Sequence, residues 1–213
     1  FSSKRDSRYA KERFIRLPAP GKYVSGGGPD VDLHEEFLGD DIRREAMPVV
    51  TFVEDEKAPE EFEASMVLAE KKCRLWLERD PEAQRPRCYL GNTLQYFGEK
   101  KRSIEILREA IQHYRAYTAA TKFDHEFSWA SFRAAQCCHN IASLSGDKAW
   151  HMLALELLGP AMSRDPHAYE LFTLAASQEA ALGHADKAEA WTAIAIGAGA
   201  TTTMPRLPHH RFG

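Results

Sequence analysis

A short acidic segment near the start of the chain carries the most compact set of possible metal ligands. It reads Asp30-Val31-Asp32-Leu33-His34-Glu35-Glu36 and directly follows Gly26-Gly27-Gly28-Pro29. Carboxylate oxygens bind hard divalent cations, and imidazole suits manganese and zinc. In an extended chain Asp30, Asp32 and His34 share one face, which favours one local metal site. Solvated acidic loops with a single histidine are also common, so the segment by itself leaves both interpretations open.

The four cysteines predict neither a disulfide framework nor a zinc site. No C-x-x-C pair occurs, which removes the zinc-ribbon and thioredoxin interpretations. Cys137 and Cys138 are neighbours, and adjacent side chains on a helix point about 100° apart, so they are poorly placed to bond each other or share a metal. We expect reduced thiols that are mostly packed in the interior.

The composition is that of a protein with a mixed surface. There are 28 basic and 31 acidic residues, a net charge of -3, and no broad positive field that would attract nucleic acid or an anionic membrane. No apolar run approaches the roughly 20 residues that cross a bilayer, and no signal peptide opens the chain. We therefore expect a cytoplasmic protein. Because the chain opens on Phe1 without a processing site, we also expect it to be part of a longer protein.

Small residues with a constant spacing indicate paired helices in the second half of the chain. Three alanines of the second half recur 34 places later: Ala142, Ala154 and Ala161 return as Ala176, Ala188 and Ala195. Small residues are needed where two helices of a hairpin approach closely, and this period is that of tetratricopeptide repeats. Gly91 and Ala110 suit an earlier repeat. A generic helical bundle is the alternative, but a bundle does not require a fixed period.

The predicted organisation is a mainly α-helical repeat array after a short β/loop segment. Residues 1–57 form the strand and loop segment, with strands expected at Phe14-Ile15 and Val49–Val53; residues 58–200 form the repeats, and 201–213 an irregular tail. A first helix begins at Pro59 and ends at Asp80. Turns at Gly98-Glu99, Gly146-Asp147 and Gly183-His184 separate paired helices, which we expect at residues 85–97, 100–120, 125–144, 147–163, 167–182 and 185–198.

Several motifs follow one another in a characteristic order. The first is a basic-apolar strand, Arg13-Phe14-Ile15-Arg16, and an aromatic-containing segment, Lys22-Tyr23-Val24, follows it. A His-Glu pair comes next, His34-Glu35. Two repeat motifs come last: Arg87-Cys88-Tyr89-Leu90-Gly91 and His125-Glu126-Phe127-Ser128-Trp129. This order resembles the C-terminal region of bacterial and phage family-2 glycosyltransferases, in which a GT-A catalytic domain precedes tetratricopeptide repeats. The early β/loop segment would then be the C-terminal edge of the GT-A domain.

The resemblance implies a metal-dependent sugar transfer from a nucleotide-sugar donor. A divalent cation, Mn or Mg, would neutralise the diphosphate of the leaving nucleotide. His34 would be a ligand of that metal, and Glu35 would line the sugar or acceptor pocket or orient His34. The Asp-x-Asp that follows an apolar strand in such enzymes is missing, and Asp30-Val31-Asp32 lacks the preceding strand. The chain as given is therefore not expected to be catalytic by itself.

A non-catalytic scaffold is the competing prediction. Its groove would bind a protein or peptide partner, or a second copy of the chain. Capture of a C-terminal carboxylate would require basic residues and asparagine repeated in the first helix of each pair; Asn92 is suitable, but Ser143 and Ser177 occupy the equivalent places, which disfavours that mode. Five aromatic residues could contact a partner, although we expect them mainly to pack in the core: Trp129, Phe132, Trp150, Tyr169 and Phe172.

Overall fold

The computed structural model describes residues 21–25, 35–39 and 58–200. The first two ranges form a two-stranded antiparallel sheet, β1 (Gly21–Ser25) and β2 (Glu35–Gly39), in which Gly21 pairs with Gly39 and Ser25 with Glu35. Among the described elements neither strand contacts a helix. The strands expected at Phe14-Ile15 and Val49–Val53 lie outside the described residues, so the GT-A edge stays a prediction.

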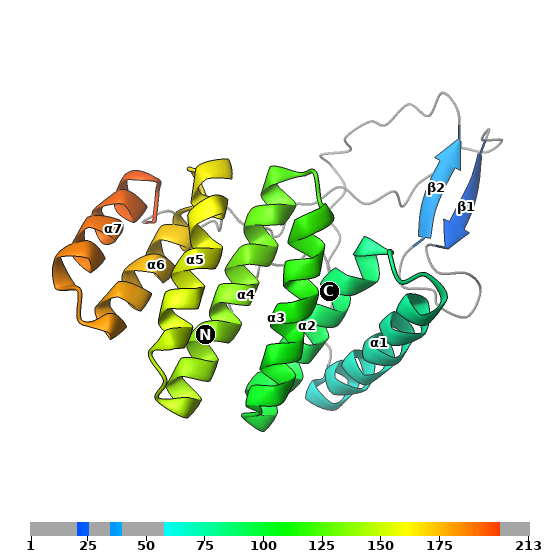
Figure 1. The fold of residues 1–213 in the computed structure, drawn as a ribbon. Helices are drawn as coiled ribbons and strands as arrows, with labels where there is room; N and C mark the ends of the chain where they lie inside the picture. Colours follow the sequence, from blue (N-terminus) through cyan, green and yellow to red (C-terminus); the bar gives the residue numbers. More distant parts are fainter. Residues whose placement is uncertain (1–20, 26–34, 40–57, 201–213) are drawn as a thin grey trace.

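The remaining described elements are all helices, which lie side by side along one array (Figure 1). The helices α2 and α3, α4 and α5, and α6 and α7 form three hairpins, and α1 packs on α2. This confirms a helical repeat array. The bounds are α1 (Pro59–Arg79), α2 (Gln84–Lys101), α3 (Ile104–Ala120), α4 (Asp124–Ser145), α5 (Ala149–Arg164), α6 (Tyr169–Leu182) and α7 (Ala185–Gly197).

Local chemistry explains where some of these helices begin or end. Pro59 opens α1 with Glu60 and Glu61 in its first turn, where carboxylates meet the positive end of the helix dipole. Gly146 and Gly183 end α4 and α6 with φ of 73° and 88°, a left-handed conformation that favours glycine. These two turns are where the sequence predicted them.

The turn predicted at Gly98-Glu99 is wrong. Helix α2 continues to Lys101, and Arg102 takes the left-handed conformation instead, with φ of 51°. Gly98 serves a different purpose, because a Cβ there would lie 2.7 Å from Leu107 Cγ of α3. Glycine is needed at this position for the close approach of two helices.

The three hairpins are unequal in length. The left-handed residues that end α2, α4 and α6 are Arg102, Gly146 and Gly183, and each is more than 34 positions from the next. The additional residues lengthen α4, which has 22 residues, whereas α6 has 14. The array therefore does not keep the strict 34-residue period that the alanines indicated.

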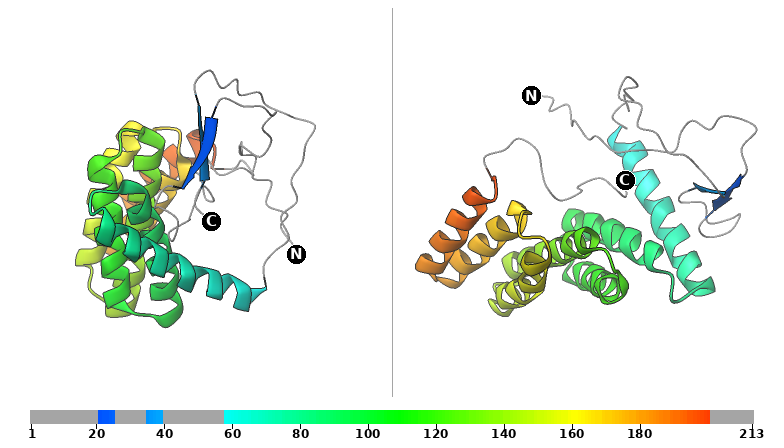
Figure 2. Two further views of the ribbon diagram at one scale, coloured as in Figure 1. Left: turned by 90° about the vertical axis from the view of Figure 1, so that its right-hand side faces the viewer. Right: turned by 90° about the horizontal axis from the view of Figure 1, so that it is seen from above.

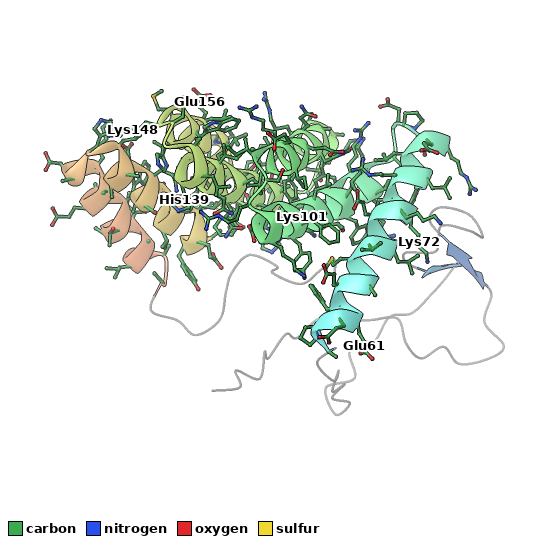
Figure 3. The ribbon with its side chains drawn as sticks, turned by 90° about the horizontal axis from the view of Figure 1, so that it is seen from below. Glu61, Lys72, Lys101, His139, Lys148 and Glu156 are labelled. Atoms are coloured by element: carbon green, nitrogen blue, oxygen red, sulfur yellow. The ribbon has the colours of Figure 1, made fainter. Side chains whose placement is uncertain are left out.

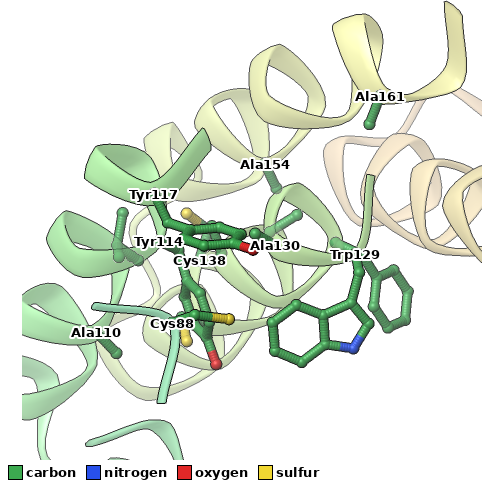
Figure 4. Packing of buried hydrophobic residues seen from close by; sticks show 14 of the residues in the cluster. Cys88, Ala110, Tyr114, Tyr117, Trp129, Ala130, Cys138, Ala154 and Ala161 are labelled. Atoms are coloured by element: carbon green, nitrogen blue, oxygen red, sulfur yellow. The ribbon is translucent and has the colours of Figure 1, made fainter. Parts of the chain in front are cut away.

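The small residues nevertheless lie where helices touch. Ala110, Ala154 and Ala161 are completely buried, and Ala142, Ala176 and Ala195 nearly so, whereas Ala188 is only partly buried. At Gly91 a Cβ would lie 2.8 Å from Cε1 of Tyr114, which is completely buried at the centre of the core (Figure 4). The Tyr114 ring also meets Trp129 edge to face, with centroids 5.9 Å apart. One tyrosine thus joins α2, α3 and α4.

The first helix of each hairpin lies on the inner face of the array. Helix α2 contacts α4, and α4 contacts α6, whereas no contact joins α3 to α5 or α5 to α7 among the described elements. The array seen from its side and from above is shown in Figure 2. None of the described helices combines the length and the apolar character that crossing a bilayer requires.

Replacing Gly91 by alanine is expected to lower the free energy of unfolding by about 1–3 kcal/mol, because the added methyl group overlaps the Tyr114 ring. Gly197→Ala is the matched control. A Cβ at Gly197 meets nothing within 4 Å, so this change at the end of α7 should alter the free energy of unfolding by no more than about 0.5 kcal/mol. Urea unfolding of both variants measures the difference. A Gly91→Ala protein as stable as the parent would contradict this packing.

Candidate functional site

A groove of about 580 Å³ crosses the inner face of the array. Two rows of polar side chains form much of its wall. The α2 row consists of Gln95, Glu99 and Arg102, and the α4 row of Arg133, Gln136, Asn140 and Ser143; Leu107, His139, Leu144 and Leu174 complete the lining.

The spacing within each row explains why its members share one face. Residues of the α4 row follow one another in steps of three, four and three positions, and Gln95 and Glu99 of the α2 row are four positions apart; Arg102 follows directly after the end of α2. Side chains three or four positions apart on a helix lie above one another. The two rows therefore run along their helices and face each other where α2 and α4 meet.

Glu99 connects the two rows. Its Oε1 accepts hydrogen bonds from Gln95 Nε2 (2.7 Å) and from Asn140 Nδ2 (2.9 Å). The Tyr114 hydroxyl helps to fix the Gln95 side chain, because it lies within hydrogen-bond distance of Gln95 Oε1 (3.1 Å). It also lies 2.8 Å from Asn92 Oδ1. The geometry of the groove is thus determined by hydrogen bonds that begin in the hydrophobic core.

Arg133 is a partly buried cation in the groove wall. Its Nη1 donates to Gln136 Oε1 (3.0 Å), and its Cζ lies 6.0 Å from the centroid of the Trp129 ring. Its Nε is buried and finds no acceptor, and no carboxylate lies within 4 Å of the guanidinium among the described residues. Burial lowers the pKa of Arg133, but Tyr114, Cys137 and Glu99 together raise it above its usual value. The side chain stays charged.

A second polar cluster joins α4, α5 and α6 beside the groove. The completely buried Gln178 accepts from His151 Nδ1 (2.7 Å) and lies 3.1 Å from His139 Nδ1 through its Nε2. Nε2 also donates to the Leu174 carbonyl (3.3 Å). The two imidazole rings are 5.8 Å apart, and Figure 3 shows His139 in the middle of the array. We did not expect this cluster, because its members come from three helices and share no spacing.

The predicted metal site is not described by the structure. His34 lies outside the described residues, as do Asp30 and Asp32, and Glu35 is the first residue of β2 with no side chain described. In the described ranges, no group of three or more His, Cys, Asp or Glu side chains could hold a metal ion. The roles of His34 and Glu35 and the Mn or Mg cofactor stay predictions.

The predicted aromatic contacts are mostly core residues. Trp129, Phe132 and Phe172 are buried, as expected for side chains packed between neighbouring helices. Trp150 and Tyr169 are partly buried, and the Arg108 guanidinium lies 5.3 Å from the centroid of the Trp150 ring. None of these five aromatic residues lines the groove.

No protein-family model matches the chain, and no curated protein matches it. Among solved structures, one described as "Crystal structure of MamA protein" matches the chain at 16% sequence identity with a TM-score of 0.31. The match covers 70% of this chain and 92% of the MamA chain. A likeness that low carries no conclusion about function.

The cysteines should be unreactive in the folded protein, because all four are buried and unbonded. Burial raises the pKa of the Cys73 and Cys138 thiols to about 12, and that of Cys88 and Cys137 well above its ordinary value. Since the thiolate is the reactive form, a thiol reagent at mildly alkaline pH should modify none of them until denaturant is added. Rapid labelling of the native protein, measured by mass spectrometry, would contradict the packing.

Proposed function

We propose that this chain is a protein-interaction scaffold that binds an extended segment of a partner protein on the inner face of α2, α4 and α6. The observation that carries the proposal is the groove, which brings polar side chains from separate helices to one open surface. Amide, hydroxyl and imidazole groups can both donate to and accept from a peptide backbone, whose N–H and C=O groups need partners when they leave water.

The stacked hairpins supply the rigidity that such a surface needs. All groove residues except Arg102 stand on long helices, and the hydrogen bonds around Glu99 hold two of these helices together. A surface that is already ordered loses less conformational entropy when a peptide binds. This favours recognition of a flexible segment by a preformed site.

The glycosyltransferase resemblance stays a separate prediction, in which the repeats would position the acceptor. It requires His34 near a divalent metal and the diphosphate of a nucleotide sugar. Replacing His34 by alanine in the intact protein is then expected to lower nucleotide-sugar turnover by orders of magnitude, with Mn²⁺ or Mg²⁺ present. Equal rates for parent and variant would make His34 an ordinary surface histidine.

The scaffold proposal predicts that a bulky side chain in the groove abolishes peptide binding. Ser143 is exposed and lines the groove, so Ser143→Trp should obstruct it. Gln112→Trp is the matched control, because Gln112 is exposed on α3 and absent from the groove lining. Peptides selected from a displayed random library against the parent protein should bind the Gln112 variant normally and the Ser143 variant weakly.

Two results would overturn this proposal. One is a selection that yields no specific peptide. The other is equal affinity of the selected peptides for the parent and for Ser143→Trp, since that would place binding elsewhere. Circular dichroism of each variant shows that the helices remain folded.

A further inference from the structure

The groove contains more positive than negative charge. Arg102 and Arg133 line it together with one carboxylate, that of Glu99, and Glu99 Oε1 is occupied by two amide donors. Neither arginine forms an ion pair within the described residues. Some other cations of the array are paired: Arg74 with Glu70 and Glu109, and Lys100 with Glu63.

Arg133 is the member of the pair that most needs an anion. A guanidinium has five N–H donors; here Gln136 and the Tyr114 hydroxyl are its hydrogen-bond partners, and the buried Nε remains unbonded. Removing a charged group from water without a counter-ion is unfavourable. An arriving carboxylate can accept two parallel hydrogen bonds from a guanidinium, which compensates for this cost.

We propose that the groove binds an acidic peptide, in which an aspartate or glutamate side chain pairs with Arg133 and a second acidic residue lies near Arg102. This inference rests on the peptide-binding function proposed above and adds the chemistry of the partner. Two arginines on different elements suit a segment with more than one carboxylate. The α4 row continues beyond Arg133 through Gln136, Asn140 and Ser143, so a peptide can extend past the charged position.

A binding role and a structural role of Arg133 have different consequences for the thermal stability of an Arg133 variant. Because the cation lacks an ion pair within the described part of the chain, Arg133→Gln removes a partly buried charge and keeps a polar side chain. The thermal midpoint of this variant should therefore stay close to that of the parent. A structural arginine would instead leave the variant clearly less stable.

Binding is measured with synthetic peptides that are acetylated at the N-terminus and amidated at the C-terminus, so that only side chains carry charge. A positional-scanning library should show enrichment of Asp and Glu at one or two positions with the parent protein. For the enriched peptides, Arg133→Gln should weaken affinity about tenfold to a hundredfold. Arg133→Lys should restore part of it, because lysine keeps the charge and lacks the planar fork.

Two further variants complete the design. Arg102→Gln should cause a smaller loss, and it tests the same charge preference if Arg133→Gln proves unstable. Arg115→Gln is the control, since Arg115 is an exposed arginine on α3 outside the groove lining, and it should leave affinity unchanged. Added salt should weaken binding to the parent more than to Arg133→Gln.

The outcomes separate this inference from the proposed function. Peptides that Ser143→Trp blocks but that show no preference for acidic residues, or no sensitivity to Arg133, would overturn the inference and leave the scaffold in place. Selected peptides that lose their binding when the C-terminus is amidated would overturn the assignment to side-chain carboxylates. If no library peptide binds in the groove, both proposals are wrong.

Discussion

The contact between Gly91 of α2 and the Tyr114 ring of α3 determines how the middle of the array is built. A side chain at Gly91 would occupy the space of that ring, so the two helices can approach this closely only with glycine there. The ring then reaches Trp129 of α4, and its hydroxyl reaches Asn92 and Gln95. Through Gln95 and Glu99 the same contact extends to Asn140. Core packing and groove geometry are therefore parts of one arrangement.

The polar cluster around Gln178 and the Arg133 side chain differ in how completely their polar groups are paired. Gln178 uses both its oxygen and its nitrogen with His151, His139 and a backbone carbonyl, which ties three helices together. Arg133 has a charge without an ion pair in the described part of the chain. Buried polar groups in native proteins are generally paired, and departures from that rule concentrate where a protein acts. The contrast favours Arg133 as the group that meets a ligand.

Most of the fold could be predicted, because helices are encoded by local signals. Proline and glutamates at the start of α1 and left-handed glycines after α4 and α6 act within one or two turns of chain. Gly98 shows the limit of such reasoning. Glycine at that position agrees equally well with a turn and with a close helix contact, and only the position of Leu107 decides between them. The strict repeat period failed for a similar reason, since alanine is needed at helix contacts whatever the length of the hairpin.

By itself the sequence determined the helical class, the approximate helix bounds and the glycines that end α4 and α6, because each depends on residues near one another in the chain. The burial of the cysteines could be predicted for another reason, since a free thiol behaves as a small apolar group. Tertiary structure alone decided which polar residues form the groove. The α2 and α4 rows are separated along the chain by the whole of α3, and they meet only because Tyr114 brings three helices together. Their spacing is visible in the sequence, but many helix faces have such spacing. Side chains become a site when packing turns two such faces toward each other.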